Sequence, residues 1–144
     1  MSCKITAFLE RQAASFQDGG PLLAVSDYDF PLPVLTSQGR DVLMTPQRLI
    51  DNWTATNAGC RALGCTHLAL RLVARELPRG SRFRLWLRYA YLTAAEAPAA
   101  GVEATFYCRD RGHRICVEMI EVTRSWGQPF TIGDRVAPGV KAAR

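Results

Sequence analysis

Long apolar segments and metal-binding motifs are missing from this sequence. No run of about 18 consecutive apolar residues occurs, so no membrane-spanning helix is predicted. The residues after Met1 lack the apolar core of a signal peptide, so we expect no secretory leader. The sequence holds two histidines, His67 and His113, and it has no Cys-x-x-Cys pair, HExxH motif or glycine-rich phosphate loop. We therefore predict no metal centre and no cofactor.

Cysteine occurs in a pattern that does not suggest disulfide bonds. The count is odd, with cysteines at positions 3, 60, 65, 108 and 116. Reduced thiols are usual in the cytosol, where they often serve as small core residues. We therefore expect a cytoplasmic protein without disulfides.

The composition is that of an ordinary globular protein. The chain has 144 residues, of which 48% are hydrophobic and 22% charged. This length is typical of a single domain. We expect one domain over residues 1–124 and a weakly patterned C-terminal tail over residues 125–144.

Lysine is scarce, and arginine carries most of the positive charge. Lys4 and Lys141 are the only lysines in a chain with a net charge of +5. Residues 71–88 hold six arginines and one acid, Glu76, so this segment alone accounts for the excess. Such a patch can attract phosphate, nucleic acid or an acidic partner. A solvated sheet face, or arginines paired with acids on neighbouring strands, explains it more simply.

Helical spacing is clearest in two segments. Apolar residues recur from Ile5 to Phe16, and Gly19 with Gly20 ends that helix, which a short second helix over 21–27 follows. Thr45 and Pro46 are a hydroxyl cap and a first-turn proline, so they predict a helix that runs to Gly64. Residues 30–35 are apolar but include two prolines, which predicts an edge strand.

Four strands with alternating hydrophobicity follow. Residues 67–77 and 82–92 form a hairpin that places Leu70 opposite Tyr89 and Leu72 opposite Leu87. Residues 102–109 and 114–124 form another through a turn at Arg111 and Gly112. The second register places Met119 and Glu121 on the inner face and Ile120 and Val122 on the outer face. The element order predicts an α+β fold: a strongly curved, mostly antiparallel sheet wrapped around about three helices.

Three segments carry a resemblance to a known family. They are the Tyr28-Asp29-Phe30-Pro31-Leu32-Pro33 entry to the first strand, the Thr45-Pro46 helix start and the closing Glu118-Met119-Ile120-Glu121-Val122 strand. Over about residues 3–124 the chain resembles a bacterial-type member of the nuclear-transport-factor-two-like superfamily, which includes SnoaL-like cyclases and ketosteroid isomerase. The resemblance implies a conical pocket between the helices and the concave sheet face, and frequent dimers through the outer face. It implies no single function.

The resemblance also names the groups that catalysis would need. Family enzymes carry a carboxylate near the first strand and a hydrogen-bond donor, often a tyrosine, on the first helix. Asp29, expected near the mouth of the pocket, and Glu121, expected on the inner face, are the candidate carboxylates. The first helix offers Phe8 and Phe16, which cannot donate a hydrogen bond. We therefore predict no complete catalytic set.

The expected faces of the sheet divide the remaining candidates into two groups. A ligand pocket is predicted from Tyr28, Trp53, Tyr89, Tyr91 and Glu121. A dimer or outer face is predicted from Arg84, Trp86, Arg88, Tyr107, Glu118 and Ile120. The rings of the first group could equally fill the core.

The outer face carries a charge problem. Arg75 opposite Arg84, and Arg71 opposite Arg88, would place like charges across the hairpin, which is destabilising. We therefore predict that Glu103 or Glu118 pairs with Arg84 or Arg88.

Three function classes follow from these observations. The first is a small-molecule-binding protein with a conical apolar pocket and a small apolar ligand. The second is a SnoaL-like isomerase, cyclase or hydrolase that uses a pocket carboxylate. The third is a dimeric protein-interaction module. We expect a homodimer and no nucleic-acid partner, because Trp86 is the one aromatic residue on the expected arginine face of the 67–92 hairpin.

Overall fold

The computed structural model describes residues 2–127, 131–132 and 135–136. Its helices are α1 (Ser2–Ala13), η1 (Ala14–Phe16), α2 (Gly20–Ala24), η2 (Val25–Asp27) and α3 (Pro46–Ala62). Its strands are β1 (Leu32–Thr36), β2 (Gly39–Leu43), β3 (Cys65–Arg75), β4 (Arg82–Thr93), β5 (Pro98–Asp110), β6 (Ile115–Trp126), β7 (Thr131–Ile132) and β8 (Arg135–Val136).

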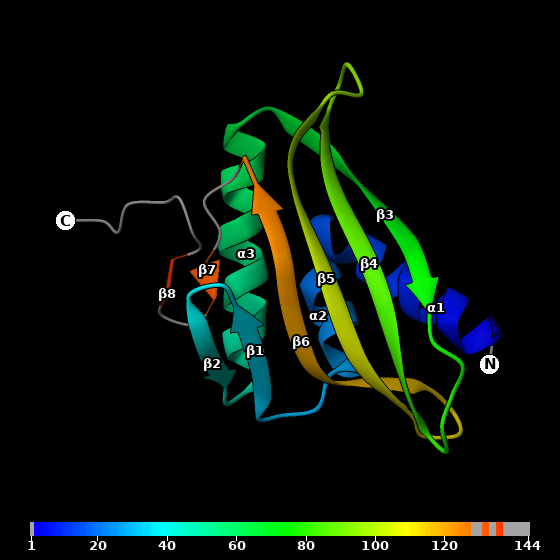
Figure 1. Cartoon of the computed structure of the whole chain (residues 1–144). Coiled ribbons are helices and arrows are strands. Elements are labelled where there is room, and N and C mark those ends of the chain that lie inside the picture. Colours follow the sequence, from blue (N-terminus) through cyan, green and yellow to red (C-terminus); the bar gives the residue numbers. More distant parts are fainter. Residues whose placement is uncertain (1, 128–130, 133–134, 137–144) are drawn as a thin grey trace.

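One six-stranded sheet, in the order β2-β1-β6-β5-β4-β3, organises the domain. The long strands bend across the molecule, and the three α-helices lie on one side of them (Figure 1). Every neighbouring pair is antiparallel except β1 and β6, which run parallel. The predicted α+β class, with a curved sheet around three helices, is confirmed.

Helix α3 begins and ends where the sequence predicts. The Thr45 hydroxyl accepts a hydrogen bond from the backbone N–H of Arg48 at 3.4 Å, and Pro46 is the first helical residue. Gly64 follows with φ of 88°, a left-handed conformation that favours glycine.

The first strand is internal, so the prediction of an edge strand is wrong. β1 lies between β2 and β6, and its register with β6 includes only Val34 and Leu35. Both residues follow Pro33, so this proline lies outside the part of β1 that pairs with β6, although it is opposite Val42 in the β1–β2 pair. The prolines therefore shorten this pairing without confining β1 to the edge.

The register between β5 and β6 differs from the prediction in a way that matters for the site. The backbone N–H of Arg111 donates to the carbonyl of Arg114 at 2.9 Å, so the turn centres on Gly112 and His113, one residue later than expected. This later turn moves the β5–β6 pairing by two residues, so each side chain next to the turn stays on its predicted face of the sheet.

A β-bulge beyond the turn then exchanges the faces of β6. Cys108 pairs with Val117, but Tyr107 pairs with Met119, so Glu118 is an extra residue in β6. Because alternation has a period of two, this extra residue turns the side chains that follow it to the opposite face, as far as a second register shift at Thr123. The predicted inward position of Glu121 and the predicted outward position of Ile120 are therefore both wrong.

The residue pairs in the middle of the β3–β4 hairpin match the predicted register. Leu70 lies opposite Tyr89, Leu72 opposite Leu87, and Arg71 opposite Arg88, as expected. A register shift between Leu72 and Ala74 then places Arg75 opposite Leu85. The expected pairing of Arg75 with Arg84 is therefore wrong.

The core fills the space between the concave sheet face and the helices. Phe8 on α1 meets Phe106 on β5 edge-on, with ring centroids 6.3 Å apart. The cysteines at 60, 65, 108 and 116 are buried free thiols, and burial raises the pKa of the Cys60 thiol to about 12. They act as small core residues.

The segment beyond β6 includes a small two-stranded sheet of β7 and β8, and β7 lies against α3 (Figure 1). Residues 128–130, 133–134 and 137–144 of the predicted tail lie outside the described residues. None of the described helices has the length and hydropathy needed to cross a membrane.

Candidate functional site

A cavity of about 80 Å³ lies between α3 and the concave face of the sheet. Its lining is mainly apolar and aromatic, and its polar groups are three phenols, an amide, a hydroxyl and the indole N–H of Trp53. The described residues around it are Tyr28, Val34, Leu43, Leu49, Asn52, Trp53, Thr56, Tyr89, Tyr91, Val102, Ala104, Phe106, Ile120 and Val122. Small-molecule sites commonly combine apolar walls with a few polar groups in this way.

Four of the five residues predicted to line a pocket meet at this cavity. Tyr28 and Trp53 contact each other edge-on, with ring centroids 5.4 Å apart. Tyr89 stacks against Phe106 at 6.3 Å, with the ring planes 16° apart. Tyr91 lies further along β4 on the same face. The rings form opposite walls, because Trp53 comes from α3 and Tyr89 from the sheet.

The cavity has a closed end and an open side. Tyr28, Tyr89, Tyr91 and Phe106 are buried. Asn52 and Trp53 on α3, and Val102, Ile120 and Val122 on the sheet, are half-buried. The gap between α3 and β5–β6 is therefore the way in from solvent.

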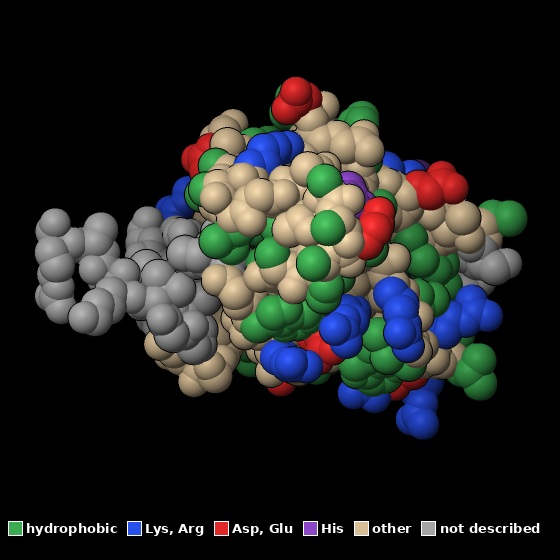
Figure 2. All heavy atoms as spheres, turned by 90° about the horizontal axis from the view of Figure 1, so that it is seen from above, with side chains coloured by type: hydrophobic (Ala, Val, Ile, Leu, Met, Phe, Trp, Pro, Cys, Tyr) green, Lys and Arg blue, Asp and Glu red, His purple; other side chains and the backbone are tan. Residues whose placement is uncertain are grey.

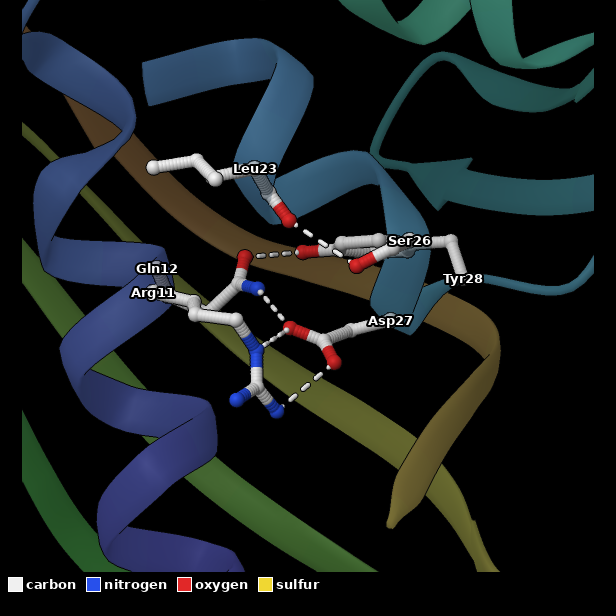
Figure 3. Close-up of polar contacts among 6 residues, drawn as sticks. All are labelled: Arg11, Gln12, Leu23, Ser26, Asp27 and Tyr28. Atoms are coloured by element: carbon white, nitrogen blue, oxygen red, sulfur yellow. Dashed lines mark hydrogen bonds and ion pairs between the residues drawn. The ribbon is translucent and has the colours of Figure 1, made fainter.

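A chain of polar side chains lies behind the closed end (Figure 3). The Arg11 guanidinium donates from Nε and one terminal nitrogen to the two oxygens of Asp27, at 2.8 and 2.9 Å. Gln12 donates from Nε2 to the same carboxylate at 3.2 Å. The Tyr28 hydroxyl donates to Oε1 of Gln12 at 2.6 Å. The chain therefore runs from a partly exposed arginine to a phenol in the cavity wall.

Local structure brings these residues together. Arg11 and Gln12 are adjacent on α1, while Asp27 ends η2 and Tyr28 follows it. Gln12 and Asp27 are fully buried, so each must satisfy its polar atoms inside the protein. Sequence analysis missed this chain. The available signal was a polar Gln12 midway between Phe8 and Phe16 on the apolar stripe.

Burial keeps the cavity phenols in their neutral form. The pKa of Tyr28 is well above its ordinary value, first because the hydroxyl is removed from water and then because Tyr89 lies beside it. Burial likewise raises the pKa of Tyr89 and of Tyr91. Neither a phenolate base nor a phenolate nucleophile is therefore present near neutral pH.

Neither candidate carboxylate lies at the cavity. Glu121 is on the outer face, where its Oε1 accepts a hydrogen bond from the Tyr107 hydroxyl at 3.1 Å. Asp29 pairs with Arg111 at the β5–β6 turn, and its backbone N–H donates to Val117. Among the described residues that line the cavity, none is an acid, a histidine, a lysine or an arginine. No described group of three or more His, Cys, Asp or Glu residues could hold a metal ion.

The outer face is basic and largely ion-paired. Arg84, Trp86, Arg88, Tyr107 and Glu118 lie there, as expected. Figure 2 shows Lys and Arg side chains gathered on one side of the molecule, beside acidic and hydrophobic groups. Arg88 pairs with Glu103 at 3.3 Å, so the prediction that one of these acids pairs with Arg84 or Arg88 is confirmed.

The other pairs on this face differ from that prediction. Arg84 pairs with Glu76 at 2.6 Å, and this pairing raises the pKa of Arg84. Glu118 instead contacts Arg82 at 3.0 Å and Arg109 at 3.2 Å. The arginine-rich hairpin therefore meets acids from its own turn and from β5 and β6.

Arginine guanidinium groups on this face also stack on the rings of two tryptophans. The Arg84 guanidinium is 5.2 Å from the centroid of Trp86. Arg88 and Arg124 lie 5.1 and 4.8 Å from the centroid of Trp126. Such cation–π contacts hold the guanidinium groups close to the sheet.

Comparisons with known proteins identify the fold. No family model matches the sequence, and no curated protein matches it. An NTF-2 like protein of unknown function from Shewanella oneidensis superposes with a TM-score of 0.65 at 11% identity, over 85% of this chain and 98% of that chain.

Two further solved structures cover more of this chain. A Nostoc punctiforme protein of unknown function with a cystatin-like fold gives a TM-score of 0.60 at 8% identity, over 96% of this chain and 92% of that chain. A putative calcium/calmodulin dependent protein kinase II association domain from Xanthomonas campestris gives 0.57 at 10% identity, over 94% and 87%. At these identities the likeness concerns the fold alone. The chain has the nuclear-transport-factor-two-like fold, as its sequence predicts.

Proposed function

We propose that the chain binds a small, largely apolar molecule in the cavity between α3 and the sheet, and that it does so without acid/base catalysis. One observation carries this proposal. The cavity is walled by aromatic rings and has polar groups at defined points, yet its described lining residues include no carboxylate, histidine, lysine or arginine. Such a lining favours binding by shape and apolar contact.

The SnoaL-like isomerase, cyclase or hydrolase alternative receives less support. Glu121 bonds to Tyr107 on the outer face, and Asp29 pairs with Arg111 away from the lining. A general base must come within hydrogen-bond reach of its proton, and neither carboxylate faces the cavity. Tyr28 is a poor oxyanion donor, because its one hydroxyl hydrogen is directed at Gln12.

The volume limits the ligand. About 80 Å³ is well below the roughly 300–1,000 Å³ of sites for drug-sized molecules. We therefore expect a ligand with about one small ring. A larger ligand would have to displace Trp53, the half-buried ring on the open side.

Two measurements test this function. Native mass spectrometry of the purified protein should show a small molecule that is released on unfolding. Pyrrole should also shift the NMR signals of the cavity residues in the wild-type protein, whereas Ala104→Leu, which fills the cavity from β5, should remove that response.

The matched control is Ala69→Leu, which makes the same change at an exposed position on β3. It should leave the response to pyrrole intact. If Ala104→Leu folds and responds to pyrrole as the wild type does, the ligand does not occupy this cavity.

We also propose that the outer sheet face forms a homodimer, as an interaction module would. Val73 at the edge is 52% exposed, and Trp86 and Met119 on this face are half-buried in the single chain. Apolar groups among neutralised charges favour self-association, because pairing of the arginines reduces repulsion between two copies. This proposal is independent of the cavity.

The buried cysteines support a cytoplasmic setting. All five cysteines are free thiols, four of them inside the core. Reduced thiols are usual in that compartment. Fractionation of cells that express the chain tests the proposal.

A further inference from the structure

We propose that the ligand presents a hydrogen-bond donor, a hydroxyl or an N–H, to the Tyr28–Tyr89 end of the cavity. This inference rests on the proposed binding function and adds the chemical class of the ligand. It follows from the direction in which each hydrogen bond of the buried chain must run. Asp27, at the end farthest from the cavity, fixes the direction of these hydrogen bonds.

The Asp27 carboxylate accepts hydrogen bonds and donates none. Both of its oxygens receive hydrogen bonds from Arg11. The nearest atom of the Gln12 amide must therefore be the nitrogen, because an amide oxygen facing a carboxylate would leave two acceptors opposed. Asp27 thus sets the orientation of the Gln12 amide.

The fixed amide sets the direction of the next hydrogen bond. With Nε2 directed at Asp27, Gln12 turns Oε1 toward Tyr28, 2.6 Å from the phenol oxygen. A carbonyl oxygen only accepts, so Tyr28 must donate its single hydroxyl hydrogen there. The Tyr28 oxygen keeps its lone pairs and has no hydrogen left for the cavity.

The same constraint passes to the second phenol. Tyr89 lies beside Tyr28, and both rings pack against Phe106, with ring centroids 6.3 and 6.4 Å from its centroid. Because the Tyr28 hydrogen points at Gln12, Tyr89 is the one phenol of the two that can donate to the other. With the Tyr89 hydrogen directed at Tyr28, both phenols at the closed end offer only lone pairs to a molecule in the cavity.

This polarity separates two classes of ligand. A hydroxyl or N–H group placed at this end completes the chain as its last donor. A ketone, an ether or a carboxylate would place acceptor against acceptor in a site removed from water. An unmatched buried polar group is costly, so the second class is rejected.

Pyrrole and furan test the inference on the wild-type protein. They are five-membered rings of nearly the same size, and they differ in an N–H donor against an oxygen acceptor. NMR titration should show pyrrole binding about fivefold more tightly than furan, the ratio that one neutral hydrogen bond supplies. Equal affinity, or tighter binding of furan, would overturn the inference and leave the proposed function standing. If neither molecule binds at millimolar concentration, both the inference and the proposed function fail.

A pair of variants tests the cause of the preference. Tyr28→Phe removes the acceptor that holds the Tyr89 hydrogen, so that hydrogen becomes available to the ligand and the preference for pyrrole should disappear. Tyr91→Phe removes a cavity hydroxyl that lies outside the chain, and it should keep the preference. If the preference for pyrrole survives in folded Tyr28→Phe protein, the hydrogen-bonded side chains from Asp27 to Tyr28 do not set that preference. If Tyr28→Phe fails to fold, the comparison of pyrrole with furan on the wild-type protein tests the inference by itself.

Discussion

The Tyr28 hydroxyl donates to the side-chain oxygen of Gln12 across 2.6 Å, and neither side chain is appreciably exposed to solvent. This bond joins the cavity wall to the buried pair of Arg11 and Asp27. We therefore expect stability and the proposed ligand choice to depend on the same four side chains.

Removing the middle of this chain should destabilise the fold. Gln12→Leu leaves the Tyr28 hydroxyl without its acceptor and Asp27 without one of its donors. We expect the free energy of unfolding to fall by about 2–4 kcal/mol, as for buried polar groups that lose their partners. Urea denaturation measures this change.

Gln17→Leu, the same substitution at an exposed site on the same side of the sheet, should cost under about 0.5 kcal/mol. Equal losses in the two variants would contradict the account.

Ion pairs at the β5–β6 turn should make stability depend on pH in the acid range. Lys4 contacts Asp110 at 2.8 Å, and this hydrogen bond, with that from the Gly112 N–H, holds the pKa of Asp110 below its ordinary value. A carboxyl whose pKa is lower in the folded state stabilises the protein above its unfolded value, about pH 4. That stabilisation is lost as the pH falls through the folded pKa.

Asp110→Asn should therefore flatten the loss of melting temperature below about pH 4. Lys4→Met should flatten it in the same way, because it removes the partner and leaves the carboxyl. A pH profile in either variant as steep as that of the wild type would show that this pair does not contribute.

The position of Glu121, a candidate carboxylate predicted on the inner face, has a direct test. Because this carboxylate bonds to Tyr107 on the outer face, Glu121→Gln should leave the affinity for pyrrole within about twofold of the wild type. A loss of binding in Glu121→Gln, measured by the same NMR titration, would place Glu121 at the cavity and contradict the register of β6.

The outer face can be tested separately from the cavity. Trp86→Glu places a charge among the apolar groups of the proposed dimer interface and should give a monomer by light scattering at micromolar concentration. The control is Leu22→Glu, because Leu22 is 68% exposed on α2, away from this face. A wild-type protein that is itself monomeric, or a Trp86→Glu variant that stays dimeric, would exclude this interface.

Local sequence signals were sufficient for most of the fold and part of the site. Thr45, Pro46 and Gly64 marked the longest helix, and the alternation around Leu70 and Leu72 fixed which face of β4 carries Tyr89 and Tyr91. These predictions succeeded because caps and alternation act over a few residues.

The errors came from interactions that local patterns do not encode. In β6 the apolar positions change from 115 and 117 to 120 and 122, and that change was the signal of the bulge at Glu118. Strict alternation therefore placed Glu121 inside. The contact between Gln12 and Asp27 joins residues 15 apart on two helical segments, so no periodic pattern could predict it.

The most direct test of the account maps where pyrrole binds. NMR chemical-shift changes in the wild-type protein at saturating pyrrole should concentrate on the lining of the cavity, at Thr56 on α3, Tyr89 on β4 and Val122 on β6. Shifts that concentrate on the outer face around Trp86 and Tyr107, or no saturable shifts, would contradict the central claim that this cavity is a ligand site.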